Sequence, residues 1–271
     1  MIRVLPDLLR AADAILARGG ELGHPLHVLG ETTSTNDEAK HAAKSGAPHG
    51  STWVAESQLG GRGRQGRAWF AAPGESLLFS VLLRMPCPLS RLPQLALAAG
   101  LAVRDAIGAP SLLKWPNDVV VRDGASLRKI AGVLVETTMT GRTVDAVVVG
   151  IGINVHTRHF PEELASRASS VSLVMQATRP ASDPPDRAEL LADVLARLDR
   201  EVHLVASRGL GLLLARLQEA DALRGQRVRS DQGEGTACGL DAEGRLLVKS
   251  DDGVVARWGA GEVTLVATAG G

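Results

Sequence analysis

The sequence of 271 residues has no tyrosine, and aromatic residues make up only 3% of it. A buried core must therefore consist mainly of leucine, valine and alanine, and an apolar content of 45% is ample for one. The only two cysteines, Cys87 and Cys238, are far apart and form no C-x-x-C pair, which argues against a cysteine-based metal cluster. We interpret them as free thiols in a reducing cytosol.

The chain also lacks an excess of charge of either sign, because 30 Lys and Arg residues balance 30 Asp and Glu residues. A net charge of zero argues against a surface built throughout for nucleic acid or an anionic membrane, although a local basic site is still possible. No apolar run is long and charge-free enough to span a bilayer, and the N-terminus does not have the pattern of a signal peptide. We therefore expect a cytoplasmic protein without a membrane partner.

Helical patterns occur in several parts of the chain. Residues 6–18 predict an amphipathic helix. Its apolar side is predicted to consist of Leu8, Leu9, Ala12, Ile15 and Leu16. Thr35 and Glu38 have capping-box spacing, which predicts a second helix that begins near Asn36. Further helices are predicted at 91–108, 188–206 and 210–223.

Apolar runs bounded by turn residues predict strands at 52–56, 76–84, 112–115, 118–121, 129–137 and 144–155. Most of them follow one another directly, which favours an α+β fold with a mixed sheet flanked by helices over a doubly wound parallel sheet. After Arg224 come short strands at intervals of roughly ten residues, as in a small barrel. We expect a domain boundary near residue 222, giving units 1–222 and 223–271.

The segment GRGRQGRAWF, residues 61–70, follows a predicted strand and places Arg62, Arg64 and Arg67 among glycines. Glycine lets backbone N–H groups approach a ligand closely, and arginine presents a charged fork of donors to phosphate or carboxylate. The segment therefore predicts an anion-binding loop. A solvated loop and an RNA-binding Arg–Gly segment are the alternatives. It is not a Walker A loop, because no G-K-[ST] follows.

Other polar residues stand at the ends of predicted strands. In KWPND, Pro116 forces a turn that leaves Lys114, Asn117 and Asp118 able to converge on a ligand, and Asp118 could hold a cation. A plain turn is the alternative. Lys129 begins an apolar strand, where a buried cation is costly unless an anion pairs with it. An alternative that explains the position of Lys129 equally well is that the strand end is frayed and the lysine is exposed to solvent.

Three further features suggest space and hydrogen-bonding groups for a ligand. Gly150 and Gly152 alternate on one strand and predict a slot, with Asn154 on the same face, unless a helix crosses there. Gly132 leaves similar room. The hydroxyls and amide of TSTN, residues 33–36, suit a neutral polar ligand, or only cap a helix. His156 and His159 have no third ligand nearby, so we reject a metal site there.

In their order and spacing, STN, ESQLGGRGRQGRAWF, KWPND, RKIAGVLVE and GIGIN resemble the catalytic domain of biotin protein ligases. The tail RLLVKSDDGVVARWGAGEVTL resembles the C-terminal domain of that family. The resemblance implies a class II synthetase-like catalytic domain and a small SH3-like β-barrel. It also implies that the carboxylate of biotin attacks the α-phosphate of ATP to give biotinyl-5′-AMP and pyrophosphate. A lysine of a carrier protein then takes the biotin and releases AMP.

The resemblance assigns roles to individual residues. Arg64 and Lys129 are the implied catalytic residues. The implied biotin site consists of Ser34, Thr35, Asn36, Gln58, Gly61, Arg62, Gly63, Arg64, Lys129, Gly132, Gly150 and Gly152. The implied ATP contacts are Arg62, Arg64, Arg67, Trp69, Asn117, Asp118, Lys129, Asn154 and Trp258. Mg²⁺ is expected with ATP, with Asn117 and Asp118 as plausible contacts and its ligands otherwise unknown. We expect residues 58–70 to be mobile in the protein without ligand.

The implied partner is the biotin carboxyl carrier protein or domain of biotin-dependent carboxylases. Some family members also carry an N-terminal winged helix-turn-helix. Here about thirty residues precede STN and predict one helix, whereas that module needs at least two, so we expect a ligase without DNA-binding activity. The alternatives are a lipoate–protein ligase-like enzyme, an RNA-binding protein and an inactive biotin sensor. The Arg–Gly loop, residues 61–70, and the C-terminal tail favour biotin over lipoate as the substrate. The net charge of zero argues against RNA binding, and the presence of both Arg64 and Lys129 argues against an inactive sensor.

Overall fold

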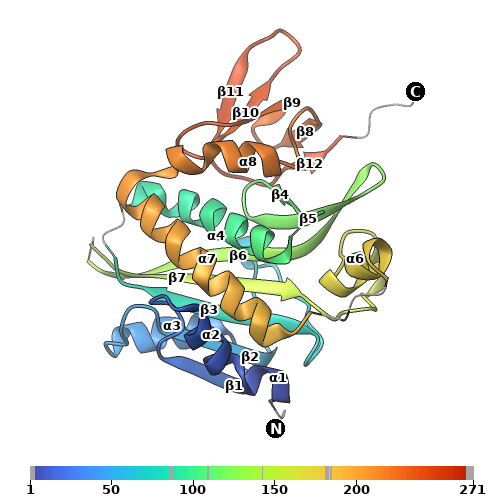
Figure 1. Cartoon of the computed structure of the whole chain (residues 1–271). Coiled ribbons are helices and arrows are strands. Elements are labelled where there is room, and N and C mark those ends of the chain that lie inside the picture. Colours follow the sequence, from blue (N-terminus) through green and yellow to red (C-terminus); the bar gives the residue numbers. More distant parts are fainter. Residues whose placement is uncertain are drawn as a thin grey trace.

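The computed structural model describes residues 4–85, 88–108, 110–141, 143–180, 183 and 185–266. Cys87 lies outside these residues. A large sheet is flanked by helices, and the C-terminal segment forms a smaller sheet (Figure 1). The large sheet has seven strands in the order β1–β2–β3–β7–β6–β5–β4. Their bounds are β1 (Leu26–Thr32), β2 (Thr52–Gln58), β3 (Ser76–Leu83), β4 (Leu112–Lys114), β5 (Asp118–Asp123), β6 (Ser126–Thr140) and β7 (Thr143–Asn154).

Pairing in the large sheet is mixed. Strand β1 runs parallel to β2, and every other neighbouring pair is antiparallel. The predicted α+β fold with a mixed sheet is therefore confirmed, and β5, β6 and β7 pair in sequence order. Strand β1 was not predicted from the sequence. It is an edge strand whose side chains are mostly half-buried, so buried and exposed positions do not clearly alternate along it.

Helices cover both faces of the large sheet (Figure 1). On one face α4 (Leu92–Ile107) packs against α7 (Arg187–Arg208), and on the other α3 (Thr35–Lys44) lies against β3 and β7. Alternate residues of β3 separate accordingly: Phe79 joins the core beneath α4 and α7, whereas Leu82 joins a smaller core with α3. The remaining helices are α1 (Pro6–Leu9), α2 (Ala11–Arg18), α5 (Glu162–Ala165), α6 (Val171–Thr178) and α8 (Leu214–Ala220). The short 3₁₀ turns are η1 (Arg64–Gly66), η2 (Leu89–Arg91) and η3 (Leu210–Leu213).

The N-terminal helix differs from its prediction. It is divided at Arg10 into α1 and α2. Leu8 and Ile15 are buried as predicted, but Leu9 and Leu16 are 64% and 71% exposed, and Ala12 is exposed. The buried stripe runs instead through Ala11 and Ala14. Helical spacing sets the buried face, and small alanines at those positions let α2 pack closely against α7.

The start of α3 also corrects the sequence analysis. Ser34, not Thr35, is the N-cap residue, and its side chain makes no capping hydrogen bond. The backbone N–H and the hydroxyl of Thr35 both donate to Gln58 Oε1, at 2.7 and 3.0 Å. Glu38 accepts a hydrogen bond from Thr32 Oγ1 at 2.6 Å. The predicted capping box is therefore wrong, because both of its side chains bind residues outside the helix.

The small sheet confirms the predicted C-terminal β domain. Its strands pair antiparallel in the order β11–β10–β9–β8–β12. They are β8 (Arg227–Ser230), β9 (Gly233–Leu240), β10 (Leu246–Lys249), β11 (Val255–Trp258) and β12 (Thr264–Leu265). The indole N–H of Trp115 donates to the carbonyl of Gly244 at 3.0 Å, which ties this domain to the turn between β4 and β5.

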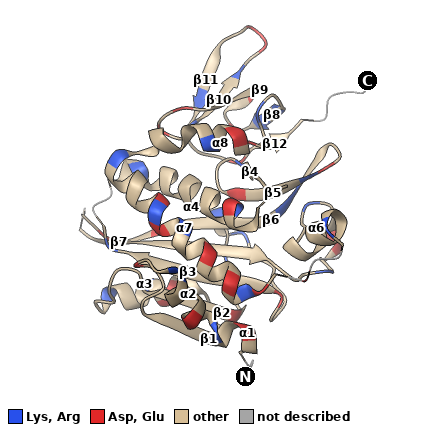
Figure 2. Cartoon of the chain, in the orientation of Figure 1, with Lys and Arg blue, Asp and Glu red and all other residues tan. Residues whose placement is uncertain are grey.

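Positively and negatively charged residues alternate along the visible helices and strands, in keeping with the balanced composition (Figure 2). Among the described residues, every helix is too short or too polar to cross a lipid bilayer.

A buried cation joins three elements beneath this charged surface. Arg187, at the start of α7, is fully buried and donates to both oxygens of Asp7 on α1, at 2.7 and 2.8 Å. It also donates to both oxygens of Glu56 on β2, at 2.7 and 3.0 Å. Burial opposes its charge, but the hydrogen bonds that it donates to Asp7 and Glu56 raise the pKa of Arg187 above its ordinary value. The triad fixes the N-terminal segment to the sheet.

Replacing Arg187 by Met is expected to lower the free energy of unfolding by about 3–5 kcal/mol, because Glu56 would stay buried without its partner. Methionine keeps much of the volume, so the loss reports on charge and not on a cavity. Arg10→Ala is the matched control, since Arg10 forms an exposed pair with Asp186 between the same two segments and should cost about 1 kcal/mol or less. Urea denaturation measures both. Equal losses in the two variants would contradict a stabilising role for the triad.

Candidate active site

The predicted glycines of β6 and β7 lie side by side on the sheet face that α3 covers. Gly132 pairs with Gly152, and Gly150 pairs with Ser80 of β3. A Cβ at Gly152 would lie 2.7 Å from the Trp69 ring, and one at Gly150 would lie 2.1 Å from Asn36 Oδ1. The slot predicted from these glycines therefore exists, but the protein's own Trp69 and Asn36 side chains lie against the backbone in it.

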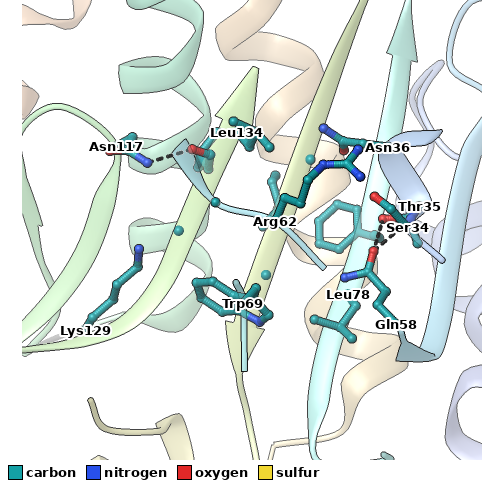
Figure 3. A pocket seen from close by; sticks show the side chains of 17 residues that line it. Ser34, Thr35, Asn36, Gln58, Arg62, Trp69, Leu78, Asn117, Lys129 and Leu134 are labelled. Atoms are coloured by element: carbon teal, nitrogen blue, oxygen red, sulfur yellow. Dashed lines mark hydrogen bonds between the residues drawn. The ribbon is translucent and has the colours of Figure 1, made fainter. Parts of the chain in front are cut away.

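Beside this slot is the first cavity, with an empty volume of about 440 Å³ including solvent at its mouth (Figure 3). It is lined by Ser34, Thr35, Asn36, Gln58, Arg62, Gly63, Trp69, Leu78, Phe79, Asn117, Lys129, Gly132, Val133, Leu134, Gly150, Ile151 and Gly152. Its polar groups are mostly neutral and are already oriented. Ser80 Oγ donates to Asn36 Oδ1 at 2.6 Å, and Thr35 donates to Gln58. The cavity combines apolar walls with fixed amide and hydroxyl groups.

The Arg–Gly loop folds back on itself above the sheet. Arg62 forms an isolated β-bridge with Ala68, and the backbone N–H of Trp69 donates to the carbonyl of Gly61 at 2.9 Å. These contacts do not test whether residues 58–70 are mobile without ligand, which stays a prediction.

The three arginines of the loop diverge. Arg62 turns to the first cavity and donates to Asp37 at 2.6 Å. Arg67 pairs with Glu262 of the small sheet's domain. Arg64 donates only to neutral oxygens, Asn117 Oδ1 at 3.4 Å and the Gly261 carbonyl at 3.3 Å. Its charge therefore has no carboxylate partner among the described residues.

The second cavity is larger, with an empty volume of about 1320 Å³ including open solvent. Four segments meet there: the Arg–Gly loop, the KWPND turn, residues 160–168 and residues 261–263. Its lining consists of Gly63, Arg64, Gln65, Arg67, Ala68, Trp69, Phe70, Lys114, Trp115, Pro116, Asn117, Asp118, Val120, Leu127, Lys129, Asn154, Phe160, Leu164, Arg167, Ala168, Gly261, Glu262 and Val263.

The two cavities share a short boundary. Gly63, Trp69, Asn117 and Lys129 line both of them. Lys129 Nζ pairs with Asp118 at 2.6 Å and lies 5.1 Å from the centroid of the Trp69 ring. The indole N–H of Trp69 is buried and has no hydrogen-bond partner within the described part of the chain. A cation and an unused donor therefore stand where ligands from the two cavities would meet.

Unpaired positive charge distinguishes the second cavity. Within the residues that the structure describes, Arg64, Lys114 and Arg167 line it without an ion-pair partner. Burial lowers the pKa of Lys114, although the carboxylates of Asp118 and Glu262 act in the opposite direction; the charges of Lys129 and Arg67 add to the effect of burial. Uncompensated cations on partly buried walls favour an anionic ligand.

Most of the predicted site residues line one or both cavities, but two do not. Trp258, predicted to contact ATP, is 3% exposed and packs in the hydrophobic core with the small sheet. Gly61 lines neither cavity, and its carbonyl instead closes the base of the loop by accepting from Trp69. The predicted ligand contacts of Trp258 and Gly61 therefore stay predictions, and in this structure neither residue lines a cavity.

Several residues that line the second cavity were not assigned a role from sequence. Lys114 was part of the KWPND motif, and Glu262 was part of the tail that carried the resemblance. Phe160, Leu164 and Arg167 lie in a segment without any motif, and the fold brings it to the head of β6: the backbone N–H of Lys129 donates to the Arg167 carbonyl at 2.7 Å. Only the pairing of this segment with β6 in the folded chain shows that it lies at the second cavity.

One group of side chains within the described residues has ligand atoms close enough to share a metal ion: Glu21, His49 and His203. None of the three lines either cavity. His49 Nδ1 accepts the backbone N–H of Arg84 at 3.0 Å, so in the neutral ring the proton is on Nε2, the atom that faces Glu21. A protonated Nε2 is not a metal ligand. Asn117 and Asp118, whose side chains carry oxygen atoms, line the second cavity.

Comparison with known proteins agrees with this geometry. The Biotin/lipoate A/B protein ligase family matches residues 28–154, and the Biotin protein ligase C terminal domain matches residues 225–266. The biotin–[acetyl-CoA-carboxylase] ligase of Mycobacterium tuberculosis is 36% identical over 238 residues, which cover 82% of this chain and 82% of that protein. The bifunctional ligase/repressor BirA of Bacillus subtilis is 33% identical over 233 residues, which cover 82% of this chain and 68% of that protein.

Among solved structures, the biotin protein ligase from Aquifex aeolicus in complex with biotin and ATP superposes with a TM-score of 0.75 at 30% identity. The match covers 90% of this chain and 99% of that one. Sequence and fold thus agree. The chain belongs to the biotin protein ligase family and is an ATP-dependent ligase.

Proposed function

We propose that this ligase binds biotin in the first cavity and ATP in the second, and that the two react at their shared boundary. The observation that carries the proposal is the place of Lys129, which lines both cavities. In the reaction a carboxylate attacks a phosphate, and both groups are anions. A cation between them offsets their repulsion and the charge that develops on the α-phosphate.

The chemistry of each cavity supports this assignment. The ureido ring of biotin needs neutral donors and acceptors, which Ser34, Thr35, Asn36 and Gln58 supply, and Leu78 and Leu134 provide apolar walls for its chain. A triphosphate needs cations, and the second cavity has three that form no ion pair within the described residues, Arg64, Lys114 and Arg167. Phe70 and Phe160, with ring centroids 6.4 Å apart, offer an aromatic end for adenine, and Asn154 is a further candidate contact.

The reaction then follows in two steps. The biotin carboxylate forms a bond to the α-phosphorus, the bond to the β-phosphate oxygen breaks, and pyrophosphate leaves. The amine of the carrier lysine next forms a bond to the biotin carbonyl carbon, gives up a proton, and displaces AMP. We propose that Lys129 holds the carboxylate and α-phosphate in the first step, with Arg64 on the phosphates. The loop then covers the anhydride and excludes water.

Mg²⁺, when bound, would neutralise phosphate charge, and the site offers suitable residues for it. Carboxylate and amide oxygens suit this ion, and Asp118 and Asn117 present both at the second cavity. Asp118 is paired with Lys129 at 2.6 Å, so we propose that the lysine turns from Asp118 to the substrates when they bind. Asp118 is then free to hold the metal ion.

We further propose that residues 1–222 and 223–271 are two functional units. The second unit supplies Gly261, Glu262 and Val263 to the ATP cavity, so it completes a site that the first unit mainly forms. The carrier is proposed to be the biotin carboxyl carrier protein or domain of a carboxylase, as the name of the Mycobacterium tuberculosis relative suggests. Helices α1 and α2 pack against α7, and we propose that this segment does not read DNA.

The first prediction concerns the boundary cation. Lys129→Gln and Arg64→Ala are each expected to slow biotin-dependent exchange of labelled pyrophosphate into ATP by about 10²–10³-fold, because each removes a donor to the developing charge. Arg128→Gln is the matched control, since Arg128 precedes Lys129 on the same strand but pairs with Asp123 outside both cavities. The exchange is measured without carrier protein.

Normal exchange in Lys129→Gln would contradict the role of the boundary. Absence of exchange in the wild type, with biotin binding intact, would point to a different acid. Lipoate is the next acid to test, in direct competition with biotin, because the matched family also includes lipoate ligases.

A second prediction concerns the contact between Trp69 and the sheet. Gly152→Ala places a methyl group within 2.7 Å of the Trp69 ring and must displace it. We expect the Kd for biotin to rise about tenfold, within the range of overpacking costs, with a smaller change for ATP. Gly211→Ala is the control, because its added Cβ meets no atom within 4 Å. Titration calorimetry measures both ligands. Unchanged biotin affinity would show that the indole position does not matter for binding.

The third prediction is a pH dependence from Lys114, whose pKa burial lowers from the ordinary 10.5. Bound triphosphate favours the charged amine, so ATP binding raises this pKa again. Above the lowered pKa, binding must take up a proton, and ATP affinity therefore falls as pH rises toward 10.5.

The fall should be steeper in the wild type than in Lys114→Met, whereas Lys249→Met, which removes an exposed lysine of β10, should follow the wild type. ATP Kd values measured across this pH range decide the matter. Parallel pH profiles for wild type and Lys114→Met would exclude Lys114 as the titrating contact.

A further inference from the structure

A chain of charged side chains lies behind the first cavity, and three of its members do not line it. Arg62 donates to Asp37 at 2.6 Å, and Lys40 binds Asp37 at 3.0 Å and Glu136 at 2.8 Å. Glu136 accepts the amide N–H of Asn36 at 2.6 Å. Asp37, Lys40 and Glu136 thus connect two lining residues, Arg62 and Asn36, that come from the loop and from α3.

The fold supplies each link in this chain. Asp37 and Lys40 are three residues apart on α3 and therefore lie on the same side of the helix. Glu136 follows Gly132 and Leu134 at alternate positions of β6, so it stands on the sheet face that α3 covers. The side chains of Lys40 and Glu136 are only 25% and 27% exposed. Solvent therefore screens their attraction less than that of a surface pair.

The pKa directions agree with a coupled set of charges. A hydrogen bond from Arg62 lowers the pKa of the Asp37 carboxyl, against the effect of burial, and Lys40 contributes in the same direction. Burial opposes the charge of Lys40, but its hydrogen bonds with Glu136 and Asp37 raise its pKa above the ordinary value. Asp37 and Lys40 therefore both carry their charges at neutral pH.

The network fixes the amide of Asn36 in one orientation. Its Oδ1 accepts from Ser80, and one N–H donates to a carboxylate oxygen of Glu136. The backbone of Gly150 closes the space behind it, since a Cβ there would lie 2.1 Å from Asn36 Oδ1. The second N–H is the donor that Asn36 has left for a ligand in the cavity.

The other end of the network holds the loop. In Figure 3 the side chain of Arg62 extends from the loop toward the Asn36 end of the cavity. Its Nη2 is bound to Asp37, whereas Arg64 and Arg67 of the same loop are turned to the second cavity. Asp37 therefore anchors the part of the loop that closes the first cavity and not the part that lines the second.

We propose that Asp37, Lys40 and Glu136 are positioning residues for biotin, which set the Asn36 donor and the Arg62 guanidinium before the substrate arrives. This inference rests on the proposed function, because it assigns the first cavity to biotin. Groups that are already fixed need not be ordered on binding, so the network strengthens biotin binding by lowering the entropic cost. ATP, held by other residues in the second cavity, gains nothing from it.

Glu136→Gln tests the Asn36 end with little change in shape, since it removes the charge that orients both Lys40 and Asn36. We expect the Kd and KM for biotin to rise about tenfold, as for loss of one charge-assisted hydrogen bond, with kcat at saturating biotin within about threefold. The Kd for ATP should stay within about twofold of wild type. A purely structural role would lower the melting temperature and weaken both ligands together.

Lys40 offers a second variant and a rescue. Lys40→Met breaks both links and should weaken biotin binding at least as much as Glu136→Gln, whereas Lys40→Arg keeps a cation and should restore most of the affinity. Asp37→Asn combined with Glu136→Gln should weaken biotin binding by less than the product of the single effects, because both act through Lys40. Glu189→Gln is the control. Glu189 pairs with Arg18 at 2.7 Å, and neither residue lines either cavity.

Wild-type protein that binds biotin, with Glu136→Gln and Lys40→Met also binding it within about twofold, would overturn the inference and leave the proposed function intact. Biotin and ATP affinities that fall in parallel in these variants would overturn it as well. Wild-type protein that binds ATP but not biotin would instead overturn the proposed function itself.

Discussion

The contact between the Trp69 indole and the backbone of Gly132 and Gly152 is the constraint on which the site depends. The ring occupies the space that side chains would fill at both glycines, with atoms 3.1 and 2.7 Å from where their Cβ atoms would lie. It therefore docks the Arg–Gly loop at one place on the sheet. The loop then separates one space into two cavities, and Lys129 lies over the same ring at their boundary.

Once the loop is docked, the pairing of its cations gives each cavity a different character. Arg62 is bound by Asp37, so it contributes a fixed position to the first cavity more than free charge. Arg64 and Lys114 have no carboxylate partner within the described residues, so their charge is available to an anion in the second. The charge of each cavity can therefore favour a neutral ring in the first and a polyanion in the second, before any group reacts.

Much of the fold could be predicted because its buried strands and long helices are strongly apolar. Strands β3, β6 and β7 and helices α4 and α7 were expected near their observed bounds. The edge strand β1 was not, because an exposed edge needs no apolar alternation. The face predicted for the N-terminal helix was only partly right: Leu8 and Ile15 are buried, but the helix is divided at Arg10, and the small Ala11 and Ala14 are buried in place of Leu9 and Leu16.

Motifs marked most residues that line the cavities, but they could not show how those residues are paired. Trp258 belongs to a recognised segment and nevertheless packs in the core, since burial depends on the rest of the small sheet. Glu136 binds Asn36 across a separation of 100 residues, and no local pattern connects the two. The chemical type of a residue sets which groups it can present to a ligand. Its partners in the fold determine whether those groups are still free to bind one. The motifs therefore locate the chemistry of this ligase, and the polar network behind them determines how firmly each group is held for it.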